Sequence, residues 1–407
     1  MSFAKMDVHE KIVDALRDEQ ITEPTEIQDW TIPLILEGEH VIGISKTGSG
    51  KTAAFAVPVL DSVWPGDGIQ AIVIAPTREL ALQISDQMKL FGKNLDVSVA
   101  TVFGGVSYGP QIQEMKRAEI VVGTPGRILD HIRRGNLQTD RVEMVVLDEA
   151  DKMTEMGFIE DIEVIIDSTP DKRQVLLFGA TISRKIENLQ RKYMPDPVWA
   201  EAERHVGEEY LEQFYFDISR FEKFSLLMHL IETEKADQMI IFCSACRTAD
   251  LVYRNLKLQK RDALLLHGKL SQHKRFKVID KFNKNKAKLM VASPVAARGL
   301  DIQHVTHIIN YDLSQDPEEY IHRVGRTARA GKSGKAITLL SDRDYSVFSR
   351  IENQFSLRIT KLDSPSFKRY PFKTQFNDSR NGRGRRGSLR GHRHRRFRRG
   401  NSWRRRR

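Results

Sequence analysis

Short apolar runs repeat along this chain at intervals that leave room for a helix between them. The first group, residues 40–181, reads HVIGIS, IQAIVIAP, VSVATVFGG, AEIVVGTP, VEMVVLDEA and RQVLLFGAT. The second group, residues 239–341, reads MIIFCS, RDALLLHG, KLMVASP, VTHIINYD and KAITLLS. Near-continuous Val, Ile and Leu runs of this length are typical of parallel strands that helices bury on both faces. The pattern therefore predicts two α/β domains in tandem, each with an open parallel sheet.

The segments outside these groups differ in composition and suggest the domain boundaries. YMPDPVWAEAERHVGEE, between the groups, is polar and reads as an interdomain linker. We expect a first domain at residues 1–203, a linker at 204–211 and a second domain at 212–363, which suits a chain of 407 residues. After Asp363 the apolar periodicity stops, and residues 364–407 are expected to be a disordered tail.

The charge of the chain is concentrated in this tail. The whole chain carries a formal net charge of +11, while residues 380–407 hold fourteen arginines and no lysine, aspartate or glutamate, so the remainder carries −3. Arginine-rich arms commonly bind polyanions such as nucleic acid. Aromatic residues are interleaved with the basic ones, and such rings can stack on unpaired bases. The tail is therefore predicted to bind RNA, and the alternative is a solvated end that serves solubility.

Several protein classes are disfavoured by the composition. No stretch of eighteen apolar residues and no apolar signal region occur, so we expect a cytoplasmic protein that does not contact the membrane. The two cysteines, Cys243 and Cys246, form a single C-x-x-C, whereas a zinc site normally needs a second pair. We expect structural thiols, with a redox dithiol as the alternative.

A glycine-rich stretch directly follows the first apolar run. SKTGSGKT comprises Ser45, Lys46, Thr47, Gly48, Ser49, Gly50, Lys51 and Thr52, with serine where the usual Walker A spelling has glycine. The glycines permit a tight loop whose backbone N–H groups face an anion, lysine can reach terminal phosphates, and the Thr52 hydroxyl can ligate Mg²⁺. The stretch predicts a phosphate cradle, and the alternative is a plain glycine turn before a helix.

Two further groups of charged residues follow apolar runs. Asp148 and Glu149 come directly after a predicted strand, at the sheet edge where ligands bind. One carboxylate can hold Mg²⁺ while the other orients and deprotonates water, and the alternative is a charged surface turn. Arg323, Arg326 and Arg329 are three residues apart, on one expected helical face. They could stabilise a transferring phosphoryl group or form a solvated basic face, and the spacing alone leaves both open.

Together these motifs resemble the DEAD-box family of ATP-dependent RNA helicases, with DEAD itself at Asp148–Asp151. The resemblance covers about Phe3 to Leu340. EPTEIQ is similar to the Q motif, and PTREL (76–80), Gly104–Gly105 and TPGR (124–127) are similar to RNA-contacting motifs of the first domain. IIFCSACRT, HGKLSQHKR, ARGLD and HRVGRTAR are similar to motifs of the second. The resemblance implies two RecA-like domains and RNA-stimulated ATP hydrolysis coupled to local strand separation.

The resemblance also implies a role for each matching residue, with ATP and Mg²⁺ as ligands. Lys51 and Thr52 would bind phosphate and Mg²⁺, Asp148 would hold Mg²⁺, Glu149 would be the general base, Arg326 and Arg329 the arginine fingers, Gln28 the adenine-reading amide, and Asp301 a neighbour of the ribose. Arg78, Gly105, Thr124, Arg127, Arg275 and Ser293 would contact the RNA backbone. Backbone contacts carry no base information, so a monomeric core should bind single strands and short duplexes with little sequence preference.

Departures from the family pattern keep a second function open. Motif III reads Gly179-Ala180-Thr181 where the family has Ser-Ala-Thr, and Pro294 stands where motif V usually has an acid. The helicase is the main prediction; the altered motif III and the basic tail favour an ATP-gated RNA clamp or annealer, with weak unwinding, as its alternative. A DNA-directed motor is disfavoured because the Q motif and the DEAD spelling belong to the RNA branch.

Overall fold

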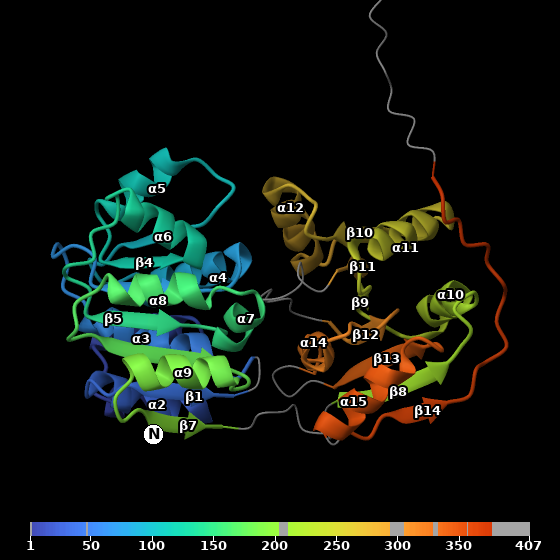
Figure 1. The fold of residues 1–407 in the computed structure, drawn as a ribbon, viewed down its shortest axis with the longest axis horizontal. Helices are drawn as coiled ribbons and strands as arrows, with labels where there is room; N and C mark the ends of the chain where they lie inside the picture. Colours follow the sequence, from blue (N-terminus) through green and yellow to red (C-terminus); the bar gives the residue numbers. More distant parts are fainter. Residues whose placement is uncertain are drawn as a thin grey trace, which may run out of the picture. The chain divides into compact units, whose positions relative to one another are not determined.

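Two parallel β-sheets form the framework of the molecule. The computed structural model describes residues 2–45, 48–202, 211–293, 305–328, 333–355 and 357–376. Each sheet has seven strands, and every neighbouring pair of strands is parallel (Figure 1). The predicted fold class of two tandem α/β domains is confirmed.

The first sheet has the strand order β3-β4-β2-β5-β6-β1-β7. Its strands are β1 (Val41–Ile44), β2 (Ala71–Ile74), β3 (Val99–Val102), β4 (Ile120–Gly123), β5 (Met144–Leu147), β6 (Gln174–Gly179) and β7 (Val198–Glu201). Each of the six apolar runs of the first group contains one strand. The seventh, β7, lies within the polar segment that we read as a linker, and it pairs with β1. Residues 198–201 fall inside the expected first domain, 1–203, so only the reading of the whole polar segment as a linker is wrong. Its composition misled because an edge strand buries few side chains, and Trp199 remains 45% exposed.

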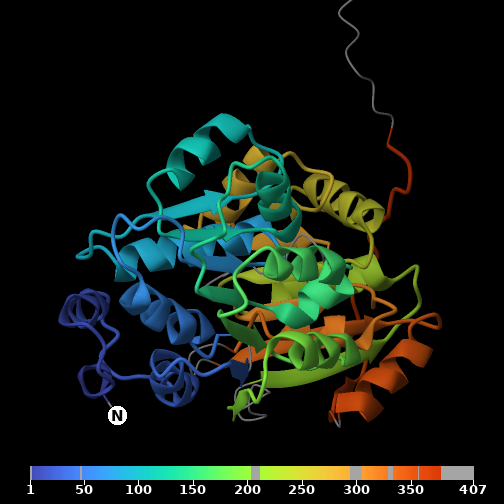
Figure 2. The same cartoon turned by 60° about the vertical axis from the view of Figure 1, so that its left-hand side comes forward.

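Helices cover both faces of the first sheet (Figure 2). They are η1 (Phe3–Lys5), α1 (Glu10–Asp18), α2 (Glu26–Leu36), α3 (Lys51–Ser62), α4 (Arg78–Phe91), α5 (Tyr108–Met115), α6 (Pro125–Arg133), α7 (Ala150–Glu155), α8 (Ile159–Asp167) and α9 (Arg184–Tyr193). Val41 and Val73 pack with side chains of α1–α4, whereas Ile42 and Ile72 pack with those of α6–α9. Because successive strand residues enter two different cores, the strands read as continuous apolar runs.

The second sheet has the order β10-β11-β9-β12-β13-β8-β14. Its strands are β8 (Leu211–Asp217), β9 (Met239–Phe242), β10 (Ala263–Leu266), β11 (Leu289–Ala292), β12 (His307–Asn310), β13 (Gly334–Leu340) and β14 (Thr360–Leu362), and its helices are α10 (Lys223–Thr233), α11 (Cys246–Leu258), α12 (Gln272–Asn283), α14 (Pro317–Val324) and α15 (Tyr345–Phe355). Cys243 and Cys246 are free thiols, and burial raises the pKa of Cys243 well above its ordinary value. A buried neutral thiol fits the structural role. Among the described residues no helix is long and apolar enough to cross a membrane.

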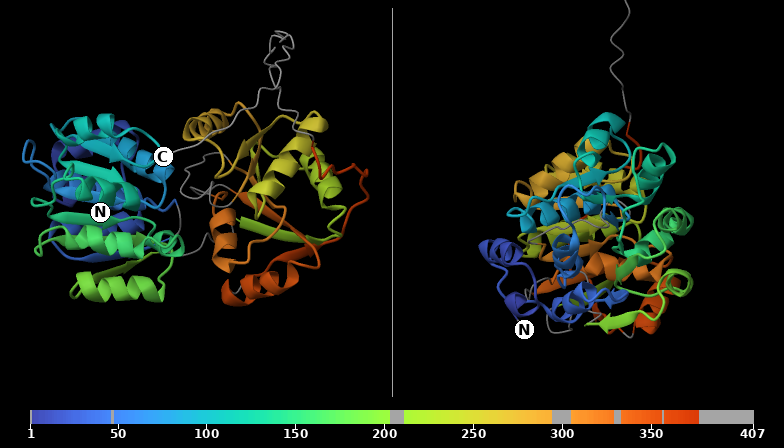
Figure 3. Two further views of the ribbon diagram at one scale, coloured as in Figure 1. Left: turned by 45° about the horizontal axis from the view of Figure 1, so that its top comes forward. Right: turned by 90° about the vertical axis from the view of Figure 1, so that its left-hand side faces the viewer.

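The segment at residues 364–372, which we call the strap, is ordered. It follows β14 and crosses the second domain, drawn in red in Figure 3. The strap contacts α10 and Glu222, the N-cap of that helix. The Phe372 and Phe224 rings pack with centroids 5.3 Å apart, and the Tyr370 N–H donates to Ser225 Oγ at 2.9 Å. Arg369 Nη2 lies 2.9 Å from Glu222 Oε1. The prediction of disorder is therefore wrong for residues 364–372, because the strap's aromatic side chains pack on the core. Residues 377–407, which include the arginine run, lie outside the described part of the chain.

Candidate nucleotide and RNA site

The predicted phosphate cradle has the expected strand–loop–helix geometry. β1 ends at Ile44 and α3 begins at Lys51. Gly48 and Gly50 have φ values of +84° and +93°, the left-handed region in which glycine carries no steric penalty. A Cβ on Gly50 would overlap the Gln28 amide, so this position also needs the space. Lys46 and Thr47 lie outside the described residues.

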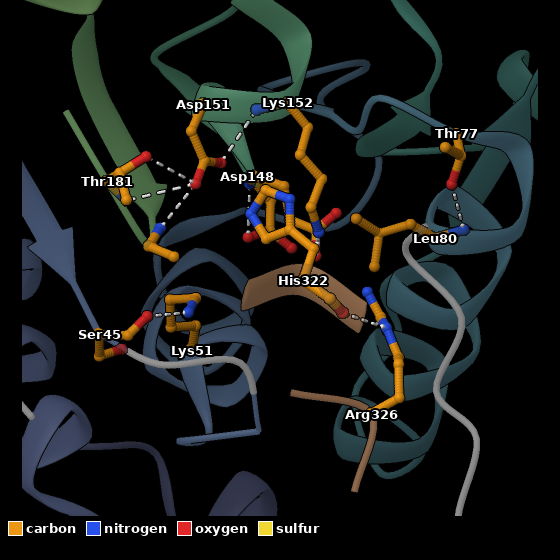
Figure 4. Close-up of polar contacts among 12 residues, drawn as sticks. Ser45, Lys51, Thr77, Leu80, Asp148, Asp151, Lys152, Thr181, His322 and Arg326 are labelled. Carbon is orange, nitrogen blue, oxygen red and sulfur yellow. Dashed lines mark hydrogen bonds and ion pairs between the residues drawn. The ribbon is translucent and has the colours of Figure 1, made fainter. Parts of the chain in front are cut away.

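Lys51 is held inside the loop rather than extended into solvent. Its ammonium donates to the Ser45 carbonyl at 2.5 Å (Figure 4). The Ser45 and Ser49 hydroxyls are 2.6 Å apart. Burial lowers the pKa of Lys51, and the nearby carboxylates, Asp148 first, oppose that shift. A phosphate oxygen is an acceptor that can take the place of the Ser45 carbonyl.

Gln28 ties the start of α2 to the phosphate loop. Its side-chain oxygen accepts from the Thr25 backbone N–H at 3.0 Å, in a capping box, and its amide nitrogen donates to the Gly50 carbonyl at 3.0 Å. Both ends of the amide are thus engaged, and reading adenine would require the same group. Phe3, the aromatic residue upstream of the Q motif, is only 2% exposed and packs in the core of the first domain.

The two acids of the DEAD sequence are buried at the end of β5. The backbone of Glu149 is left-handed, with φ +53°, and its N–H donates to Asp148 Oδ1 at 2.9 Å. Burial, followed by the charge of Glu149, raises the pKa of Asp148 to about 7, although Lys51 and Lys152 oppose the shift. The lysines around Asp148 therefore do not offset the effect of burial and of Glu149 on its negative charge.

Glu149 has one oxygen in an ion pair and one without a partner. Lys152 Nζ lies 2.5 Å from Glu149 Oε1, whereas Glu149 Oε2 is buried and has no hydrogen-bond partner. Burial alone would raise the pKa of Glu149, but Lys152, and then Arg326, outweigh it and lower the pKa. The result is an ionised carboxylate with a free acceptor, which suits a general base. Sequence reasoning missed Lys152, although its i,i+3 spacing from Glu149 was a usable signal.

The motif III loop is attached to Asp151. Asp151 Oδ2 accepts from the backbone N–H groups of Ala180 (3.0 Å) and Thr181 (3.2 Å), and Oδ1 accepts from the Lys152 N–H (3.0 Å; Figure 4). A Cβ built on Gly179 would lie 3.5 Å from Asp151 Oδ1, an ordinary contact. The loop is therefore connected to the DEAD carboxylates through the backbone, although Gly179 lacks a hydroxyl.

The arginines of HRVGRTAR do not share one helical face. α14 ends at Val324, followed by Gly325, so Arg326 lies beyond the helix that carries Arg323. Arg323 is 2% exposed and is bound to Glu319 (2.5 Å) and to the Asp312 carbonyl (2.7 Å). Arg326 is 3% exposed, and its Nε donates to the His322 carbonyl at 3.3 Å. The expectation of one helical face is wrong because the helix stops too early, and a solvated basic face is excluded for these two residues.

The donor set suits magnesium, the metal that the motifs imply. The Thr52 hydroxyl and the Asp148 carboxylate are hard oxygen donors, which Mg²⁺ prefers. The Asp148 carboxylate, whose pKa is raised, and the unbonded Glu149 Oε2 are both buried. A cation would stabilise the charge of Asp148, and its bound water could donate to Glu149 Oε2. Asp301 and Arg329, expected near the ribose and the phosphates, lie outside the described residues.

Predicted RNA contacts of the first domain meet at one loop, residues 103–107, which we call the glycine loop. A Cβ on Gly104 would lie 3.3 Å from Arg78 Nη2, so the Arg78 guanidinium packs on the loop, and Gly105 has φ +84°. On the other side, Arg127 donates to the carbonyl of Val106. Thr124, the N-cap of α6, donates its N–H to the Val102 carbonyl at 3.1 Å, directly before the loop.

Of the two predicted contacts of the second domain, Arg275 lies next to this group, because it pairs with Glu79, the residue after Arg78. Arg275 lies in the first turn of α12, and its Nη2 is 2.9 Å from Glu79 Oε1 in α4. Ser293 follows β11, is 3% exposed, and has its Oγ 3.8 Å from Cys246 Sγ. The RNA contacts of Arg275 and Ser293 stay predictions.

Comparisons with known proteins agree with this geometry. The chain matches a model of the DEAD/DEAH box helicases at residues 25–189 and one of the helicase conserved C-terminal domain at residues 222–331. It is 42% identical over 368 residues to the ATP-dependent RNA helicase CshA of Listeria monocytogenes, across 90% of this chain and 71% of that protein. S. cerevisiae Dbp5 bound to RNA and ADP BeF3 superposes with a TM-score of 0.82 at 31% identity, across 89% and 95% of the two chains. Mss116p bound to ssRNA and AMP-PNP superposes with a TM-score of 0.81 at 27% identity, across 89% and 79%.

Proposed function

The chain belongs to the DEAD-box family of ATP-dependent RNA helicases, and from this premise we propose how its own residues carry out the reaction. It is an RNA helicase that hydrolyses ATP. We assign Glu149 as the general base, and the observation that carries this assignment is its buried, unbonded Oε2. The proton of the attacking water passes to Glu149 while the water oxygen attacks the γ-phosphorus and ADP leaves.

Cations around the same site stabilise the charge that develops during this transfer. Lys51 binds the terminal phosphates in exchange for the Ser45 carbonyl, and Arg326 and Arg329 act as arginine fingers. Thr52 and Asp148 hold Mg²⁺, which when bound neutralises phosphate charge. We assign Gln28 to the adenine, residues 45–52 to the phosphates and Asp301 to the ribose.

RNA binds through its backbone in this proposal. Arg78, Gly105 and Thr124 contribute from the first domain, and Arg275 and Ser293 from the second, with Arg127 considered below. Single strands and short duplexes are bound largely without sequence preference because phosphates and sugars, not base edges, are contacted. The core acts as a monomer in the cytoplasm, and the arginine run at residues 380–407 holds additional RNA.

Glu149→Gln tests the assignment of the base. The amide keeps the shape but cannot accept the proton, so ATP turnover should fall about 10²-fold or more while ATP and RNA still bind. Glu160→Gln, at an exposed position of α8, is the matched control and should behave like the wild type. Because the Glu149→Gln substitution leaves the Lys152 ammonium without its ion pair, thermal stability is measured alongside. Normal turnover in a folded Glu149→Gln protein would refute the assignment.

A clamp or annealer is the second candidate function, because Gly179 lacks the hydroxyl that motif III has in the family. In that case ATP controls RNA release, and strand separation is weak. Duplex separation and strand annealing are compared with ATP and with a non-hydrolysable analogue. Separation that requires hydrolysis supports productive unwinding, whereas annealing with either nucleotide and little separation supports the clamp.

A further inference from the structure

Tyr108, the first residue of α5, belongs to no motif of the sequence and lies at the centre of a polar cluster. The Arg127 guanidinium carbon is 4.2 Å from the centre of the Tyr108 ring, and that of Arg134 is 4.6 Å from it. The Tyr108 hydroxyl donates to Asp130 Oδ2, and the His131 ring contacts the Tyr108 ring edge-on, with centroids 5.4 Å apart. One aromatic ring thus joins α5 to most of the length of α6.

The Arg127 guanidinium is held by three contacts within the first domain. It is 9% exposed, Nη1 donates to Gln111 Oε1 at 3.1 Å, and Nη2 donates to the Val106 carbonyl at 3.2 Å. Its flat face lies against Tyr108. A guanidinium used in this way holds a loop and a helix together instead of presenting its fork to a phosphate.

The buried side chain of Gln111 fixes the orientation of Arg127. Gln111 is 4% exposed, its amide nitrogen donates to the Phe103 carbonyl at 3.0 Å, and its oxygen also lies 2.9 Å from His131 Nε2. Because that oxygen accepts from Arg127, His131 Nε2 is the protonated ring nitrogen. The glycine loop is thus held at its first residue by Gln111 and near its last by Arg127.

We propose that Arg127 and Tyr108 are positioning residues, which hold the glycine loop at a fixed distance from Thr124 so that both segments engage one RNA strand together. This inference rests on the proposed RNA contacts of Gly105 and Thr124. It assigns Arg127 a different role from the direct backbone contact that the family motif implies. The energetic logic is preorganisation, since a loop that is already ordered loses less entropy when RNA binds.

The substitution Arg127→Lys distinguishes a positioning role of Arg127 from a direct phosphate contact. Lysine keeps the positive charge but has neither the planar face that stacks on Tyr108 nor the fork that reaches both Val106 and Gln111. A direct phosphate contact would survive partly in Arg127→Lys, whereas a positioning role would be lost. Tyr108→Ala removes no charge, so it weakens RNA binding only if positioning matters.

The experiment measures binding of the full chain to a single-stranded RNA oligonucleotide across a range of salt concentrations, together with the RNA dependence of ATPase activity. Arg127→Lys and Tyr108→Ala should each weaken RNA binding about tenfold, as expected for a lost preorganised contact surface. Neither should change the slope of log affinity against log salt. The RNA concentration for half-maximal ATPase should rise by the same factor, more than the maximal rate falls. Tyr108→Phe, which keeps the ring, should retain most of the affinity.

Two control variants separate the possible outcomes. Arg133→Ala removes an exposed arginine of α6 outside the cluster and should leave RNA binding unchanged. Arg78→Ala, at a proposed direct contact, should flatten the salt slope by about 0.7.

Wild-type affinity in Arg127→Lys, with a slope flattened by about 0.7 in Arg127→Ala, would overturn the positioning role and establish a phosphate contact. A lower melting temperature of Tyr108→Ala with unchanged RNA affinity would also overturn it. If Arg78→Ala has no effect on RNA binding either, the proposed RNA site of the first domain fails as well, which is a distinct result.

Discussion

Replacing Gly179 with serine should strengthen the connection between motif III and the DEAD carboxylates. The backbone at Gly179 is not left-handed, and a Cβ there would lie 3.5 Å from Asp151 Oδ1 and 3.5 Å from the Thr181 carbonyl. A serine side chain therefore fits without strain, and its hydroxyl lies within reach of the Asp151 carboxylate. Asp151 Oδ1 already accepts from the Lys152 N–H, so the new bond would be shared.

The magnitude follows from the kind of hydrogen bond that forms. Bonds to charged acceptors contribute about 1.5–3 kcal/mol, and sharing the acceptor should reduce this to about 1 kcal/mol. Gly179→Ala is the matched control, because it adds the same Cβ and the same loss of unfolded-chain entropy, about 0.4–1 kcal/mol, without the hydroxyl. The serine variant should exceed the alanine variant in melting temperature by about 2–4 °C.

The functional assay counts duplexes separated per ATP hydrolysed. If this loop limits coupling, about 1 kcal/mol corresponds to roughly a fivefold gain for Gly179→Ser over Gly179→Ala, with little change in the ATPase rate. Equal values for the two variants would show that the backbone bonds from Ala180 and Thr181 already supply the coupling. A parallel rise of ATPase and separation would show that the loop acts on hydrolysis instead.

Three further predictions concern the phosphate loop, the tail and a buried histidine. Gly50→Ala should destabilise the protein by about 1–3 kcal/mol and raise the KM for ATP, because φ is +93° and the new Cβ would displace the Gln28 amide. Gly66→Ala has a similar φ of +84° but open space around it, so it isolates the backbone strain in denaturant titrations, and equal effects on KM would refute the role of Gln28. Truncation after Ser379 removes fourteen arginines and should flatten the salt slope of RNA binding by several units, at about 0.7 per phosphate, with the melting temperature kept because the strap remains. An unchanged slope would show that the tail does not hold RNA. Burial, followed by the charge of Arg127, lowers the pKa of His131 below 6.5, so the unfolded chain binds the proton more readily than the folded protein. Stability should be retained above about pH 6.5 and decline as the pH falls below it. In His131→Gln the urea midpoint should therefore change less between about pH 7.5 and 5.5 than in the wild type. Burial also lowers the pKa of His40 and of His307, so some pH dependence should remain in the variant.

Strands with a continuous apolar composition could be predicted from the sequence, including the edge strand β10, whereas β7, β8 and β14 could not. β1 and β5 are runs of four buried residues, and their composition reflects the two cores that they separate. β7 and β14 are short edge strands with exposed side chains, so their composition resembles that of a loop. In the strap, Phe367, Tyr370 and Phe372 alternate with lysine and arginine. That pattern reads as solvated chain until the core against which the rings pack is known.

The candidate site was predictable where its residues lie close together in the sequence. Gly48, Gly50 and Lys51 lie in one loop, and Asp148 and Glu149 follow one strand, so local spacing was sufficient. Gln111 and Tyr108 could not be assigned, because their roles depend on α6, which is distant in the chain. The same limit applies to Arg127, whose motif suggests an RNA contact while its partners on α5 and in the glycine loop are known only from the fold.

The strand order of the first sheet has a consequence for synthesis on the ribosome. β1, which leads into the phosphate loop, lies between β6 and β7 and has no other strand neighbours. Residues 41–44 therefore have no partner strand until residues 174–179 have been translated, and their second partner follows at residues 198–201. At about 5–20 residues per second, β1 would wait roughly 8–30 s for the last of these strands. During that time the apolar side chains of β1 lack part of their native packing, so chaperone binding should be strongest on ribosome-bound chains that stop short of residue 201.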